Sequence, residues 1–176
     1  MAALIPDPEP VAVLASQPTL AETLARGRLP LSRILAYAAQ IAGELREMHQ
    51  RGAAHGEVST AAILLGPAGA SLAPSRPYVV LYKAQSDIEG WGNVLWEMLT
   101  GAGIPARCNL TPPPDDAPRH GPESVLPSAQ LLALKCVTEL PARRPSMVQI
   151  YTEVRVLSLL ARRYALHEVP APPPAP

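Results

Sequence analysis

A long amphipathic segment, LSRILAYAAQIAGELREMHQRG, occupies residues 31–52 and sets the main requirement on the fold. Its apolar residues recur with a helical period for about five turns, which predicts an α-helix with one buried face. The stripe consists of Leu31, Ile34, Leu35, Ala38, Ile41, Ala42, Leu45 and Met48. Ser32 is predicted to cap the start, and Arg51–Gly52 to close the end. Such a helix is about 30 Å long, so the other elements must pack along it.

A second amphipathic helix is predicted over residues 86–101, SDIEGWGNVLWEMLTG. Ser86 and Glu89 have the spacing of a capping box. Gly90 and Gly92 lie inside this helix, where each glycine costs about 1 kcal/mol relative to alanine. We therefore expect another part of the backbone to approach the helix closely at these two positions.

Shorter patterns complete a mainly helical (α+β) domain with one small β-hairpin. Residues 18–27 predict a short helix that stops at Gly27. Residues 62–65 and 70–73 predict two strands joined by the turn GPAG. Further helices are predicted over residues 126–140, capped by Ser128, and from Pro145–Ser146 to residue 168, with extended pieces over 11–15 and 78–82 and a Pro-rich surface loop over 102–127.

The chain length predicts one domain, over residues 17–168. A chain of 176 residues can bury roughly 70% of its unfolded surface. Residues 1–16 are expected to form an irregular N-terminal segment, and residues 169–176 a Pro-rich disordered tail. Aromatic residues make up only 4% and Phe is absent, so the core must be built from Leu, Val, Ile and Ala.

Charge and cysteine content exclude several functional classes. The 15 basic and 15 acidic residues balance, so no field of one sign would attract nucleic acid or an anionic membrane. No apolar run reaches the roughly 20 residues that span a bilayer, and no secretory signal is evident. Cys108 and Cys136 are too few for a disulfide framework or a zinc site. A cytoplasmic protein without metal or cofactor is expected.

Three motifs occur in an order that resembles a known family. They are EMHQRGAAHGEVSTAAILL, SDIEGWGNVLWEMLTG and LKCVTELPARRPSMVQI. Their order and spacing resemble the C-terminal lobe of protein kinases, over about residues 17–165. The motifs correspond respectively to the helix and catalytic loop, to the helix that opens with an Asp, and to the junction between the last two helices. The resemblance implies a C-lobe-like helical domain that lacks the N-terminal lobe, since no Gly-rich loop and no strand lysine precede it.

The catalytic loop departs from the family pattern. His55 keeps the family's histidine, while Gly56 stands where an arginine is usual. Glu57 occupies the position of the catalytic aspartate, Ser59 that of the lysine, and Ala62 that of the metal-binding asparagine. No acidic residue occurs between positions 58 and 86, so the family's metal-binding Asp-Phe-Gly motif has no counterpart. The activation segment is shortened as well.

Four retained residues have structural roles by this resemblance. His55 and Asp87 are expected to pair, with the Asp87 carboxylate accepting hydrogen bonds from backbone N–H groups of the loop. Gly92 matches a glycine of the family's central helix. Arg144 matches an arginine whose usual glutamate partner is missing, so it needs another acceptor or must face water.

The sequence thus predicts a catalytically inactive, pseudokinase-like module that acts as a protein-interaction scaffold or regulator. We expect no catalytic residue, no ATP binding, and a protein partner or homo-oligomer. The alternative is a divergent kinase-related enzyme that takes its N-lobe from a partner and uses Glu57 as the base. A fragment of a longer protein is a third reading. His55, Glu57 and Ser59 are close in sequence, but a Ser-His-acid triad requires a set spatial arrangement.

Overall fold

The computed structural model describes residues 17–74, 84–105, 122–138 and 140–167. These residues form five α-helices, two short 3-10 helices and one two-stranded antiparallel sheet. The elements are α2 (Leu20–Arg26), α3 (Leu31–Gln50), η1 (Thr60–Ala62), β1 (Ile63–Gly66), β2 (Gly69–Leu72), α4 (Ala84–Thr100), α5 (Pro122–Cys136), η2 (Pro141–Arg143) and α6 (Met147–His167). The predicted mainly helical fold with a small hairpin is confirmed. The extended pieces predicted over 11–15 and 78–82, and the predicted terminal segments at 1–16 and 169–176, lie outside the described residues.

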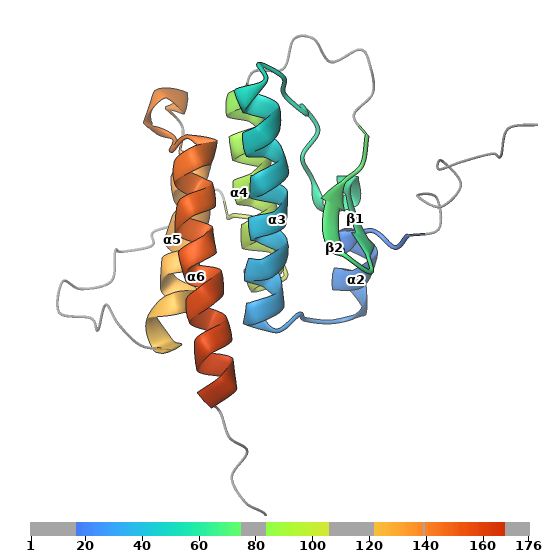
Figure 1. The fold of residues 1–176 in the computed structure, drawn as a ribbon, viewed down its shortest axis with the longest axis vertical. Coiled ribbons are helices and arrows are strands. Elements are labelled where there is room, and N and C mark those ends of the chain that lie inside the picture. Colours follow the sequence, from blue (N-terminus) through green and yellow to red (C-terminus); the bar gives the residue numbers. More distant parts are fainter. Residues whose placement is uncertain (1–16, 75–83, 106–121, 139, 168–176) are drawn as a thin grey trace, which may run out of the picture.

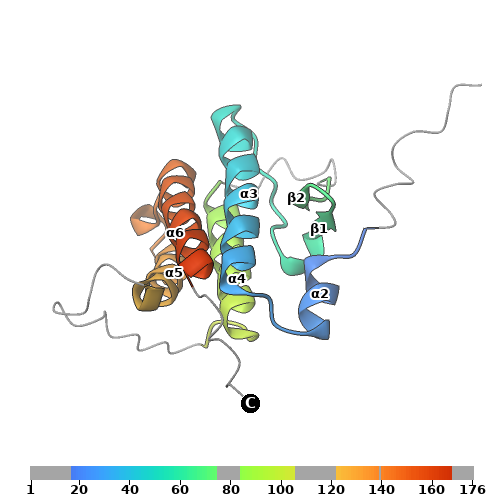
Figure 2. The same ribbon diagram turned by 60° about the horizontal axis from the view of Figure 1, so that its bottom comes forward.

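Three layers are visible in Figure 1. Helices α3 and α4 form the central layer. Helices α5 and α6 pack on one side of it, and the hairpin with α2 lies on the other, an arrangement that Figure 2 shows again from a second direction. Among the described residues, no helix combines the length and apolar character of a membrane span.

The core forms around the predicted stripe of α3. Seven residues of this helix are buried, namely Ile34, Leu35, Ala38, Ala39, Ile41, Ala42 and Leu45. Trp91 of α4 is the largest fully buried side chain among the described residues, and its indole N–H donates to the backbone carbonyl of Ala38 over 3.1 Å. The alanines of α3 leave room for this ring, because a small side chain lets a neighbouring helix approach closely. The aliphatic core expected from the composition is therefore completed by two tryptophans of α4, Trp91 and Trp96.

The three predicted serine caps are wrong. Helix α3 begins at Leu31 with Pro30 as N-cap, in the extended conformation that proline favours, so Ser32 is already inside the helix. Ser86 is the third residue of α4, which begins at Ala84. Ser128 lies well inside α5, which begins six residues earlier and tolerates Pro127 as an exposed residue of its second turn. The helix predicted over residues 126–140 therefore starts and ends later than the observed one.

The hairpin is closed along both edges. The turn pairs Gly66 with Gly69, as the GPAG motif predicts. The N–H of Leu65 in β1 donates outward to the carbonyl of Pro18 over 2.9 Å, just ahead of α2. The outward N–H groups of β2 donate instead to the side chains of two α3 residues, Gln40 and Glu44 (2.9 and 2.8 Å). A two-stranded sheet is marginal in isolation, and these contacts fix it to the helical core.

Candidate functional site

The loop that follows α3 is shaped by the way this helix ends. The N–H of Ala53 donates to the Met48 carbonyl and the N–H of Gly52 to the His49 carbonyl, both over 3.0 Å. This pair of bonds is a Schellman motif, and Gly52 has the left-handed φ of +75° that the motif places on a glycine. Helix α3 therefore ends at Arg51–Gly52, as predicted, and the chain turns back so that residues 55–58 lie against the start of α4.

A buried carboxylate of α4 holds this loop. Asp87 is fully buried, and its Oδ2 accepts the backbone N–H of His55 over 2.8 Å, while its Oδ1 accepts that of Gly56 over 2.6 Å. The Nε2 of His49, in the last turn of α3, lies 2.8 Å from Oδ2. Burial raises the pKa of Asp87, but these hydrogen bonds outweigh it and the net pKa is lowered. We call Asp87 with these three partners the Asp87 clamp.

The side chain of His55 has a structural role next to the Asp87 clamp. Its side chain is buried, its Nε2 lies 2.8 Å from the carbonyl of Ala73, and its Nδ1 lies 3.4 Å from the backbone N–H of Glu57. A neutral imidazole has one donor and one acceptor nitrogen. Here Nδ1 accepts and Nε2 donates, so both nitrogens are occupied. The ring links the loop to the end of the hairpin and is not available as a general base.

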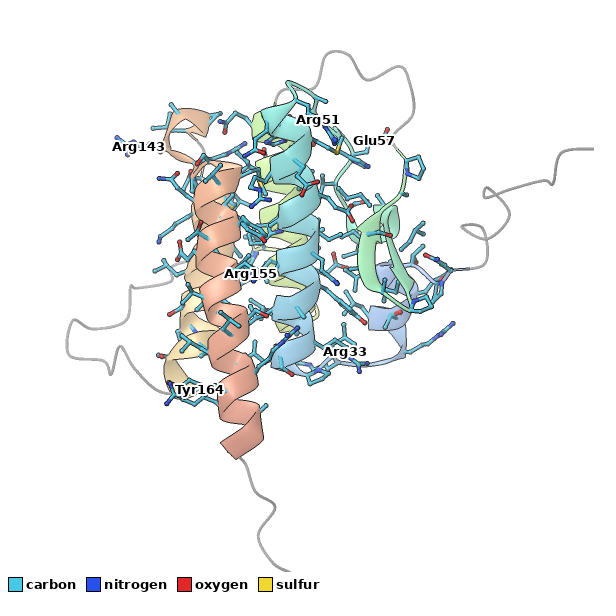
Figure 3. All side chains as sticks on the ribbon, viewed as in Figure 1. Arg33, Arg51, Glu57, Arg143, Arg155 and Tyr164 are labelled. Carbon is cyan, nitrogen blue, oxygen red and sulfur yellow. The ribbon has the colours of Figure 1, made fainter. Side chains whose placement is uncertain are left out.

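The other loop residues face outward and stay apart. Glu57 and Ser59 are exposed, and neither side chain makes a hydrogen bond to another described residue. Ala62 is the last residue of η1, and its backbone N–H donates to the Ser59 carbonyl over 3.0 Å. Figure 3 shows Glu57 at the end of the molecule where α3 finishes. His55, Glu57 and Ser59 therefore do not form a Ser-His-acid triad.

The two glycines inside α4 lie at close approaches on opposite sides of the helix. A Cβ added at Gly90 would lie 2.5 Å from the Val58 carbonyl oxygen, in the loop held by the Asp87 clamp. A Cβ added at Gly92 would lie 2.6 Å from Cys136 Cβ and 2.8 Å from the Ala133 carbonyl oxygen, both in α5. Real Cβ atoms essentially never come this close. The close backbone expected from the sequence is thus present at both positions.

Arg144 joins the start of α4 to the segment that follows α5. Its Nη2 lies 2.9 Å from a carboxylate oxygen of Glu89, and its Nη1 and Nε donate to the carbonyls of Gln85 and Thr138 over 3.0 and 3.1 Å. The sequence required another acceptor for this arginine, and Glu89 with these two carbonyls provides it. The Arg144 side chain is only 8% exposed, so all three partners are needed to compensate for its burial.

Metal and thiol chemistry find little support in the described residues. No group of three or more His, Cys, Asp or Glu side chains in this part of the chain could hold a metal ion. Cys136 is buried against α4, and burial raises the pKa of its thiol to about 12. The thiolate is the nucleophilic form of cysteine, so Cys136 is a packing residue. Cys108 lies outside the described residues.

The site is therefore a set of polar contacts that connects the loop after α3 to α4 and to the hairpin, rather than a set of reacting groups. Asp87 and His55 are brought together, and Arg144 contacts Gln85 and Glu89, which lie on either side of Asp87 in α4. Glu57 is exposed and makes no hydrogen bond to another described residue. In comparisons with known proteins, no family model matches the sequence and no curated protein matches it significantly. The chemistry of the site has to be judged from its own residues.

His49 is the member of the Asp87 clamp that sequence reasoning missed. A usable signal was present, since His49 follows the buried Leu45 by four residues and so continues the buried face of α3. A histidine on such a face requires a hydrogen-bond partner, because a buried polar group without one is costly.

Proposed function

We propose that this chain is a catalytically inactive protein kinase-like module that acts as a protein-interaction scaffold or regulator. The Asp87 clamp is the observation that carries the proposal. In the protein kinase family, an aspartate of the corresponding helix accepts backbone N–H groups of the catalytic loop. Asp87 accepts those of His55 and Gly56 in the same way. This support concerns the shape of the loop and is independent of any chemistry on it.

The residues of the loop argue against phosphoryl transfer. Kinases hold two Mg²⁺ ions with an aspartate and an asparagine and position the phosphates with a lysine. Ser59 and Ala62 stand at the lysine and asparagine positions, and neither has the charge or the amide oxygen required. Mg²⁺ sites normally include a carboxylate, and the loop has one acidic residue, Glu57, which is exposed on the surface. Shape without reacting groups is what a binding scaffold needs.

Nucleotide binding is the direct test. The melting temperature of the full chain is measured with increasing ATP and MgCl₂, and with MgCl₂ alone as the control. We expect no difference between the two series. A ligand at one hundred times its Kd stabilises a folded protein by about 2.7 kcal/mol, so genuine binding would be obvious. A saturable shift that requires both ATP and Mg²⁺ would contradict the proposal.

The alternative is a divergent enzyme with Glu57 as base, and the observation in its favour is that this side chain is exposed and makes no hydrogen bond to another described residue. It predicts phosphate transfer from ATP that Glu57→Gln abolishes and that Ser59→Ala, a change on the same exposed loop, leaves intact. We expect instead that any residual turnover is identical in the three proteins. A selective loss in Glu57→Gln would replace the scaffold proposal with the enzyme.

A further inference from the structure

A groove of about 620 Å³ runs along α3, away from the Asp87 clamp. Its floor is one face of α3, where Ala36, Ala39 and Gly43 follow each other at helical spacing with small side chains. The turn of the hairpin forms one wall and α6 forms the other, as the arrangement of these elements in Figure 1 allows. This volume lies within the range of about 300–1,000 Å³ that is typical of ligand sites.

The edge of β2 that faces the groove cannot readily pair with a further strand. Gln40 accepts from the Ala70 N–H and donates to the Ala68 carbonyl over 3.0 Å, and Glu44 accepts from the Leu72 N–H. The i, i+4 spacing on α3, about 6 Å, matches the spacing of about 6.6 Å between alternate residues of β2. Because its outward N–H groups are taken, the strand edge does not favour an extended peptide. A helical occupant fits this groove better.

The α6 wall carries positive charge that no carboxylate of a described residue neutralises, although the Arg155 guanidinium also lies over the Tyr151 ring, with 5.8 Å between its Cζ and the ring centroid. Arg155 and Arg162 are exposed residues of the wall, with the 59% exposed Leu159 between them. Figure 3 shows Arg155 extending from α6 toward α3. Throughout the part of the chain that the structure describes, neither arginine pairs with a carboxylate.

The acidic residues of the groove, in contrast, are already engaged. Glu44 binds the N–H of Leu72 over 2.8 Å, and Glu47 lies 3.6 Å from the guanidinium of Arg46. Arg46 in turn stacks on the ring of Tyr151 with 4.1 Å between its Cζ and the ring centroid. The two arginines of α6 are therefore the charges of the groove that lack a counter-charge among the described residues. A ligand with negative charge along α6, next to the exposed Leu159, would supply it.

We propose that this groove binds an acidic helical segment of a partner protein. Arg155 and Arg162 are seven residues apart, about 10.5 Å along α6. Two acidic residues seven apart on a partner helix have the same separation, and an apolar residue midway between them meets Leu159 above the small-residue floor. The proposal rests on the proposed role in protein interaction, since it names the chemistry of the partner, but it is independent of nucleotide binding.

The test uses the full chain and a fluorescein-labelled, Ala-rich peptide of about 15 residues, long enough to be helical. The peptide carries two glutamates seven residues apart and a leucine midway between them, and a control peptide carries lysines instead. We expect saturable anisotropy changes for the glutamate peptide only, weakening as salt is raised. No binding, or equal binding of the lysine peptide, would overturn the proposal.

Charge-reversal variants test the position of the site. Arg155→Glu and Arg162→Glu together should weaken binding at least about tenfold, because like charges then face each other. The matched control is Arg163→Glu, which changes an exposed neighbour outside the groove and should stay within about twofold. An equal loss in the Arg163→Glu control would mean non-specific attraction and would overturn the groove.

Two further measurements separate the competing occupants. Co-sedimentation with vesicles of phosphatidylcholine and phosphatidylserine should show no binding that depends on Arg155 and Arg162. Sedimentation of the protein alone should show no dimer that the double variant dissociates. Either result, if observed, would assign the groove to a membrane surface or to a second copy of the chain. The nucleotide titration above remains unaffected by these outcomes, so the two proposals can fail separately.

Discussion

The two sides of helix α4 are held by different kinds of interaction, hydrogen bonds on one side and apolar packing on the other. On one side Asp87 binds the backbone of the loop after α3 through hydrogen bonds, and Gly90 lets the Val58 carbonyl approach. On the other side Gly92 lets α5 pack directly onto α4, against Ala133 and the buried Cys136. The loop has no regular structure to define its place, so a charged group with directional bonds supplies it. The helix is placed by shape and apolar contact.

This difference teaches where specificity and stability reside in the molecule. A hydrogen bond to a buried carboxylate orients the backbone and adds modest net stability, but a buried donor left without its acceptor is costly. Helix packing depends on shape, because α4 and α5 share a continuous, closely packed core that admits an added methyl group only with strain. The three predictions below alter one side of α4 at a time.

Removal of the buried carboxylate should have the largest effect. Asp87→Ala leaves the N–H groups of His55 and Gly56 and the ring of His49 without their acceptor. Breaking a buried, charged hydrogen-bond set of this kind costs about 3–5 kcal/mol. Urea unfolding should show the loss as a lower midpoint with an unchanged slope.

Asn93→Ala is the matched control, because Asn93 is an exposed residue of the same helix and should change stability by less than about 0.5 kcal/mol. If Asp87→Ala does not fold, Asp87→Asn retains one acceptor oxygen and should show an intermediate loss. A fully stable Asp87→Ala protein would show that the loop is held by something other than the Asp87 clamp.

Alanine at the two glycines of α4 should have a smaller effect that differs between its sides. Gly92→Ala forces α4 and α5 apart in the core and should lower the free energy of unfolding by about 1–3 kcal/mol. Gly90→Ala meets only the loop, which can move outward. We expect it to speed amide hydrogen exchange at His55 and Gly56 and to leave global stability less affected.

Gly103→Ala is the control for both changes, since a Cβ there meets nothing within 4 Å. Equal global losses for Gly90→Ala and Gly92→Ala would remove the proposed distinction between the two sides. Faster exchange of the loop in the Gly92→Ala protein alone would reverse it.

The sequence predicted the core of this fold better than its helix caps and its long-range polar contacts. The stripe of α3, the hairpin turn and the close approaches at Gly90 and Gly92 follow from periodicity and from glycine geometry, which are local signals. Cap positions failed because Ser128 and similar residues satisfy a cap pattern equally well inside a helix. The α4 partners of Arg144 and His49 could not be predicted, because these contacts join segments tens of residues apart whose relative position only the packed core determines.

The smallest effect expected is on the pH dependence of the free energy of unfolding. The Asp87 side of α4 should contribute at acid pH and the Cys136 side at alkaline pH. The pKa of Asp87 is lowered in the folded chain, so the unfolded chain takes up the proton first as the pH falls. The Asp87 clamp is therefore at full strength above the ordinary value of 3.8 and weakens as the pH falls through the folded-state pKa. A protonated carboxyl keeps its shape and still accepts hydrogen bonds, so acid removes only part of what Asp87→Ala removes.

Cys136 acts in the opposite direction. Burial raises the pKa of its thiol from 9.0 to about 12, so the unfolded chain loses this proton first and stability on the α5 side falls as the pH rises between these values. Urea midpoints measured across pH should show a weaker acid limb in Asp87→Asn and a weaker alkaline limb in Cys136→Ala, each relative to the unaltered protein. A variant that weakened the pH dependence of the urea midpoint at both acid and alkaline pH would mean that the two titrations are coupled. The two sides of α4 would then differ in their contacts but not in their response to pH.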